Sequence, residues 1–231
     1  MLTAAEIDII LLSLKVSLIA IAVSAPFAFA VAWMLARLSF PGKLLIDALV
    51  HLPLVVPPVV TGWMLLLLLG PDGPVGGWTE RWLGLTFMFR WTGAAAAAAV
   101  MAFPLMVRGM RLAIESVDVR LENAARTLGA SRWASFLRIT LPLSVPGIAA
   151  GLVLGFARSL GEFGATITFV SSIPGETRTL PLAIYSALQA PAAEPVAARL
   201  AILSVIMSLG ALLLSEMMVR RSGVKRGMHV L

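Results

Sequence analysis

Long apolar segments alternate with short polar connections along this chain, and each segment is long enough to cross a lipid bilayer. A hydrocarbon core of about 30 Å requires about 20 apolar residues of helix, because the backbone amides must be satisfied within the segment. The pattern predicts five spanning helices, at about 9–36, 45–69, 91–108, 145–170 and 197–219. We expect residues 1–231 to form a single all-helical membrane domain, because no connection is long enough for a separate soluble domain.

The composition supports this interpretation. Of the 231 residues, 59% are hydrophobic and 13% are charged, against roughly 45–50% and 25% in soluble domains. The chain has no cysteine, which excludes disulfides and thiolate metal sites. Its two histidines, His51 and His229, are far apart in the sequence, so we expect no metal site and no cofactor in this chain.

Lysine and arginine are divided unequally between the two sets of connections, and cytoplasmic connections carry the excess of these residues. One set consists of 37–44, the 109–144 loop with the flanking Arg108, and the tail after 219. It holds Arg37, Lys43, Arg108, Arg111, Arg120, Arg126, Arg132, Arg138, Arg220, Arg221, Lys225 and Arg226. The opposite set holds only Arg81, Arg90, Arg178 and Arg199. This bias predicts an outside N-terminus, an inside C-terminus and a cytoplasmic 109–144 loop.

A polar, helix-forming stretch, RLENAARTLGASRWASFLRITLP, occupies residues 120–142 of that loop. Asp118 is expected to cap a helix at 119–128 that ends at Gly129. Ser131 is expected to cap a second short helix, which Leu141-Pro142 stops before the next span begins. The sequence therefore predicts a helix, a turn and a helix on the cytoplasmic side.

The first of these helices has one narrow apolar stripe, formed by Leu121, Ala124, Ala125 and Leu128 at helical spacing. Such a stripe suits two roles. The helix can rest on lipid headgroups, with arginines reaching anionic lipid, or it can dock into a groove of a partner protein. The two alanines favour docking, because small side chains allow a close approach to a partner whereas surface helices usually present bulky residues.

Two ionisable residues, Arg158 and Glu162, fall within the fourth predicted span at the spacing that places them on one helix face. Charges at this depth are unfavourable unless they are paired or hydrated, so they usually face a bundle interior or a pathway. The pair is either a structural ion pair or part of a translocation pathway, with Ser159 and Thr166 as further pathway candidates.

Small residues and prolines mark two other features of the spans. Gly147, Gly151 and Gly155 repeat every fourth residue and predict a close helix–helix contact. The second predicted span is interrupted by Pro53, Pro57 and Pro58. Prolines remove backbone donors, so we expect a break there.

The cytoplasmic loop resembles a motif of bacterial ABC importer permeases, E-A-A-x-x-x-G-x9-I-x-L-P. The matching residues are Glu122-Asn123-Ala124, Gly129 and Ile139-Thr140-Leu141-Pro142. Asn123 departs from the usual alanine, but it lies beside the apolar stripe rather than on it. By this resemblance, Leu121, Glu122, Asn123, Ala124, Ala125, Leu128, Gly129, Leu141 and Pro142 couple the chain to a cytoplasmic ATPase subunit.

The resemblance extends over about residues 11–205 and is most similar to the molybdate branch of these permeases. It includes ARSLGEFGATITFV at 157–170 and IPGETRT at 173–179. It implies the type I ABC importer permease fold, a homodimer in the bacterial inner membrane surrounded by lipid, and a periplasmic molybdate-binding protein. Sulfate, thiosulfate and tungstate permeases are alternatives, since sulfate and thiosulfate permeases share the loop and a version of G-E-F-G. No nucleic acid partner is expected.

The source of energy must then lie elsewhere, because the sequence contains no G-x-x-x-x-G-K-[ST] phosphate-binding loop. We expect ATP and Mg²⁺ to be bound by the partner ATPase, and this chain not to be an enzyme. A secondary transporter that uses Arg158 and Glu162 as an ion relay is the main alternative, but it leaves the cytoplasmic loop unexplained. A membrane enzyme lacks support, since no catalytic triad, paired carboxylates or metal cluster is visible.

Overall fold

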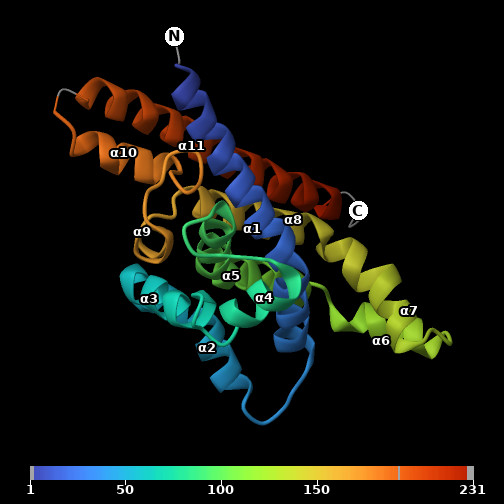
Figure 1. Ribbon diagram of the computed structural model, residues 1–231. Helices are drawn as coiled ribbons and strands as arrows, with labels where there is room; N and C mark the ends of the chain where they lie inside the picture. Colours follow the sequence, from blue (N-terminus) through green and yellow to red (C-terminus); the bar gives the residue numbers. More distant parts are fainter. Residues whose placement is uncertain (1–2, 192, 228–231) are drawn as a thin grey trace.

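The computed structural model describes residues 3–191 and 193–227, and all of its regular elements in this part are helical (Figure 1). They are α1 (Ala4–Arg37), α2 (Lys43–Val55), α3 (Pro58–Leu69), α4 (Gly76–Leu83), α5 (Trp91–Glu115), α6 (Val119–Thr127), α7 (Arg132–Ser135), the π-helical turn η1 (Phe136–Thr140), α8 (Leu141–Leu160), α9 (Gly164–Val170), α10 (Leu180–Leu188) and α11 (Glu194–Gly227). His229 lies outside the described residues.

The length and apolar character of the helices are those expected of an integral membrane protein. Within the described ranges, α1, α5, the stretch Arg132–Leu160 and the stretch Glu194–Leu214 are each long and apolar enough to cross a membrane. The pair α2 and α3 is apolar enough only when taken together, and it bends by 113°. The bend falls at Val56-Pro57, where the sequence predicted a break, because a proline cannot continue the hydrogen bonds of α2.

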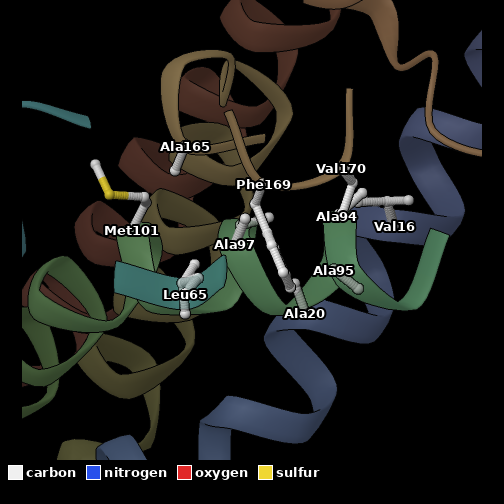
Figure 2. Packing of buried hydrophobic residues seen from close by; sticks show 11 residues of the cluster. Val16, Ala20, Leu65, Ala94, Ala95, Ala97, Met101, Ala165, Phe169 and Val170 are labelled. Atoms are coloured by element: carbon white, nitrogen blue, oxygen red, sulfur yellow. The ribbon is translucent and has the colours of Figure 1, made fainter. Parts of the chain in front are cut away.

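Helix α5 is at the centre of the fold and packs against α1 and α8. Half of its apolar window is buried, compared with 28% or less for the other three single helices, so the alanine-rich segment is the most enclosed of these four helices. Figure 2 shows Ala94, Ala95 and Ala97 of α5 beside Ala20 of α1 and Phe169 of α9. The small side chains of α5 allow these neighbours to approach closely. The helix also continues to Glu115, beyond the predicted end at 108.

The prediction of one span at 145–170 is wrong. Helix α8 ends at Leu160, and α9 begins only at Gly164. The break includes Glu162, whose Oε1 accepts a hydrogen bond from the Ala165 backbone N–H at 2.9 Å. This carboxylate satisfies a free donor at the start of α9, and helix starts need such an acceptor.

The predicted stop at Leu141-Pro142 is also wrong, since the chain remains helical from Arg132 to Leu160. The π-helical turn η1 lies directly before Pro142, and the Leu141 N–H donates to the Phe136 carbonyl, five residues earlier. Pro142 follows this turn as the second residue of α8, so the proline that lacks a backbone donor lies where the hydrogen-bond pattern changes from π-helical to α-helical.

The segment predicted as an outer connection, residues 171–196, contains a helix that the apolar pattern did not predict. Helix α10 packs against α11. Its first N–H, that of Leu180, donates to the Ser13 hydroxyl of α1 at 2.7 Å. At the start of α1, buried Glu6 pairs with Arg199 of α11 at 3.0 Å. These contacts join α1, α10 and α11 at one end of the bundle.

Candidate functional site

Helix α6 and the turn after it have the boundaries that the local sequence predicts. The Asp118 carboxylate accepts the Arg120 N–H at 2.8 Å, and the Ser131 hydroxyl accepts the Ala134 N–H at 3.1 Å. Gly129 has a φ of +93° at the end of α6, a conformation that favours glycine. Figure 1 shows α6 and α7 projecting to one side of the helical bundle.

The predicted stripe on α6 divides between an exposed and a half-buried side. Leu128 is 90% exposed and Leu121 is 48% exposed. Ala124 is exposed with them, whereas Ala125 is half-buried. An apolar ridge of two leucines with an alanine between them is therefore free to contact another molecule.

The other predicted coupling residues take different places. Asn123 and Gly129 are exposed, while Glu122 is half-buried on the inner side of α6. Leu141 and Pro142 belong to the first turn of α8 rather than to α6. The structure thus gathers the predicted coupling residues from 121 to 129 on α6 and the turn after it, and places Leu141 and Pro142 apart from them at the start of α8.

Glu122 makes contacts that the sequence did not predict. Its Oε1 lies 2.8 Å from Nη2 of Arg37, the last residue of α1, and accepts a hydrogen bond from the Thr140 hydroxyl. Arg37 Nη2 also donates to the Ile114 carbonyl at 3.2 Å, in the last turn of α5. Arg37 was counted only as a cytoplasmic charge, because nothing in local spacing links residues so far apart in the chain.

The second candidate region is the break between α8 and α9. Arg158 Nη1 pairs with Glu162 Oε2 at 2.8 Å, so the spacing predicted this contact correctly. The Glu162 side chain is 2% exposed, and its other oxygen accepts from the Ala165 backbone. Arg158 is more exposed, at 28% of its side chain. The pair therefore lies at the start of α9, with one carboxylate oxygen bonded to the α9 backbone and part of the guanidinium accessible.

Ser159 and Thr166, the remaining pathway candidates, are both buried beside this break. Within the part of the chain that the structure describes, the Ser159 hydroxyl has no hydrogen-bond partner. No group of three or more His, Cys, Asp or Glu side chains suited to a metal ion is present among the described residues.

The glycines of α8 lie against α5. A Cβ at Gly147 would come within 2.6 Å of the Ala113 Cβ, and one at Gly151 within 3.5 Å of the Gly109 Cα. At Gly155 a Cβ would lie 2.4 Å from the Met106 Cγ. Small residues let two helix backbones approach in this way, which is a common means of packing helices in a membrane.

A bundle of membrane helices with a capped, exposed helix on one side characterises a class of transport proteins. The chain belongs to the family described as binding-protein-dependent transport system inner membrane component, whose model matches residues 24–224. It is therefore a multi-pass inner membrane component of an ABC transporter and not the ATPase itself.

Individual relatives are more specific. The chain is 58% identical over 226 residues to the molybdenum transport system permease protein ModB of Escherichia coli (strain K12), covering 98% of this chain and 99% of that protein. It is 56% identical to the protein of the same name from Haemophilus influenzae, with 96% and 97% covered. The sulfate transport system permease protein CysT of E. coli is 39% identical over 81% of this chain and 66% of that protein.

Solved structures support the fold. A bacterial ABC transporter that imports the acidic polysaccharide alginate has a chain with a TM-score of 0.73 and 24% identity, covering 95% of this chain and 80% of that chain. An amino acid ABC transporter crystallised with histidines gives a TM-score of 0.65 and 20% identity, with 94% of each chain covered. Both are ABC transporters, and the similarity establishes the fold of this chain.

Proposed function

We propose that this chain is the permease subunit of an ATP-driven importer of molybdate, and that α6 is the helix through which it is coupled to a separate ATPase. The observation that carries this proposal is the exposed ridge of Leu121, Ala124 and Leu128 on a helix that projects from a membrane bundle. Apolar side chains with this exposure suit a protein groove. The relatives that cover almost the full chain are named molybdenum permeases, which supports the choice of anion.

The subunit works as a homodimer in this proposal, because a single bundle of this size scarcely encloses a pathway. The chain crosses the membrane five times, with the bent pair α2–α3 as the second crossing, and forms a single domain. The N-terminus lies outside, and the C-terminus and α6 lie inside, as the distribution of lysine and arginine favours.

Two soluble partners complete the transporter. A periplasmic molybdate-binding protein delivers the anion at the outer face, and the alginate transporter crystallised with its periplasmic protein offers a precedent for such a complex. The cytoplasmic ATPase binds ATP and Mg²⁺, while this chain binds no cofactor. Closure of the ATPase subunits moves α6 and opens the dimer outward, and hydrolysis returns it.

Within the membrane, Arg158 is the candidate contact for the passing oxyanion. Glu162 neutralises its charge, and a neutral pair with free guanidinium donors binds an anion weakly enough to release it. Tungstate and sulfate share the tetrahedral shape of molybdate, and the sulfate permeases among the relatives make sulfate the second candidate substrate.

The test is uptake into proteoliposomes that contain the permease, its ATPase and trapped ATP, with loaded binding protein outside. We expect molybdenum uptake, measured by elemental analysis, to require hydrolysable ATP and to persist when an uncoupler removes ion gradients. Uptake that stops with the uncoupler while ATP is intact would show an ion-driven transporter instead. Competition with tungstate and sulfate then ranks the three anions.

A further inference from the structure

The inner side of α6 has a second set of contacts, distinct from the exposed ridge. One carboxylate oxygen, Glu122 Oε1, meets both Arg37 Nη2 at 2.8 Å and the Thr140 hydroxyl. Arg37 and Glu122 are 15% and 22% exposed at their side chains, and Thr140 is fully buried. We call these three residues the clasp.

The clasp joins elements that are distant in the chain. Arg37 ends α1, and its Nη2 also donates to the Ile114 carbonyl near the end of α5 at 3.2 Å. Thr140 ends η1, directly before α8. The carboxylate of one α6 residue thus connects α6 to the end of α1 and to the start of α8, and through Arg37 also to the end of α5.

Without the clasp, α6 is connected to the bundle mainly by short packing contacts with α7 and η1. Its outer ridge offers nothing to the bundle, because Leu121, Ala124 and Leu128 are exposed. A partly buried ion pair with a shared hydroxyl donor is therefore the strongest directional contact of α6. Charge-assisted hydrogen bonds of this kind fix orientation better than apolar packing does.

We infer that Glu122 is a positioning residue, which fastens α6 to α1, α5 and α8 through Arg37 and Thr140 so that displacement of α6 moves these helices together. This inference rests on the proposed coupling of α6 to an ATPase. When the clasp is broken, α6 still presents its ridge and still docks, but it moves independently of the membrane helices. The expected defect is loss of coupling with retained assembly.

The experiment uses the complete transporter in proteoliposomes and compares Glu122→Ala, Arg37→Ala and the double variant. Three quantities are measured: co-purification with the ATPase, ATP hydrolysis with and without loaded binding protein, and molybdenum uptake per ATP. We expect normal co-purification and a fall of about tenfold in uptake per ATP, which is within the usual range of coupling between sites. The double variant should be no worse than either single one.

The matched control is Glu115→Ala. Glu115 pairs with Arg111 at 2.8 Å within α5, so the contact that this variant removes is a similar ion pair that joins no separate helices, and the pair between Arg111 and Asp47 of α2 at 3.2 Å stays in place. Its removal should leave uptake per ATP unchanged. If the alanine variants insert poorly, Glu122→Gln carries the test, because it keeps the side-chain volume and an acceptor for Thr140 while removing the charge.

Restoring the connection tests whether it is mechanical. The chain has no cysteine, so Arg37→Cys combined with Glu122→Cys provides one unique pair for a bifunctional maleimide. We expect the cross-link to recover uptake per ATP that the uncross-linked pair has lost. A cross-link that forms without recovery would overturn the inference.

Other results also decide the matter. Normal uptake per ATP in all clasp variants would overturn the inference. Loss of ATPase binding in Glu122→Ala but not in Arg37→Ala would also overturn it, because Glu122 would then contact the ATPase directly. If the wild-type chain neither binds an ATPase nor uses ATP, the proposed function fails and this inference fails with it.

Discussion

Helix α5 and helix α6 follow each other in the chain but are held in opposite ways. Helix α5 packs closely against three glycines of α8: backbone meets backbone at Gly151, and α5 side chains fill the space at Gly147 and Gly155. Helix α6 has an exposed outer face and is fastened on the inner face by one carboxylate. The helical core thus depends on shape, which tolerates little added volume, whereas α6 depends on a few polar contacts and leaves the apolar atoms of its outer face exposed.

The largest effect on stability is expected at the break between α8 and α9. Glu162→Ala leaves Arg158 without its partner and the Ala165 N–H without its acceptor. Breaking a buried pair on one side destabilises a protein by about 3–5 kcal/mol. Thermal unfolding in detergent should show a much lower midpoint for Glu162→Ala than for the wild type. The midpoint of Glu162→Gln should lie between the two. An unchanged midpoint would show that the core does not depend on this pair.

A bulky residue in the glycine contact tests whether shape holds α5 to α8. Gly151→Leu should destabilise the protein by about 1–3 kcal/mol or more, since its Cβ already meets the Gly109 backbone. The monodisperse fraction after solubilisation measures the loss. Gly210→Leu is the control, because a Cβ there meets nothing within 4 Å. Equal losses in both variants would contradict a specific role for the contact.

A substitution on the exposed ridge of α6 is expected to change binding of the ATPase rather than the stability of the permease. Leu128→Asp places a charge on the most exposed part of the ridge and removes no contact within the chain, so the unfolding midpoint should stay the same. Binding of the ATPase should weaken by about 1–2 kcal/mol, or about tenfold, as for an interface residue of moderate importance. Titration of the purified permease with the ATPase measures this, and full affinity would remove Leu128 from the docking surface.

The smallest effect is expected at the end of α6. Gly129→Ala introduces no clash, because a Cβ there meets nothing within 4 Å, but the φ of +93° is unfavourable for alanine. The penalty is about 1–2 kcal/mol, and it acts on the turn after α6 rather than on the core. Gly129→Asn should be milder, since asparagine tolerates this conformation. Amide hydrogen exchange in α6 should therefore increase most in Gly129→Ala and less in Gly129→Asn, and equal exchange in both variants would contradict a backbone cause.

Local signals predicted α6 and the turn after it well. The ends of α6 and α7 are set by Asp118, Gly129 and Ser131. Each contacts or shapes only the backbone of its near neighbours in the chain, so these helix ends follow from the local sequence alone. The Arg158–Glu162 pair was also predicted, because i,i+4 spacing brings the two side chains together. The family and its membrane location were predicted from the loop motif and the composition, and the comparisons confirm both.

What the sequence concealed depends on contacts between distant segments or on continuous apolar runs. The break at Glu162 lies in a stretch that reads as one span, and only Gly161 and Gly164 on either side of a buried acid hinted at it. Pro142 suggested a helix end, yet the π-helical turn before it accommodates the missing donor. Arg37 could not be linked to Glu122, because no periodicity connects α1 with α6.

The uninterrupted helix from Arg132 to Leu160 has a mechanical consequence. Its 29 residues, at about 1.5 Å each, span roughly 40 Å. One end lies just after the exposed turn at Gly129, and the other lies just before the buried acid that starts α9. A continuous helical strut therefore runs from the exposed turn to the interior of the bundle, and an axial displacement at one end is carried along it to the other, with the π-helical turn η1 as the irregular point in between.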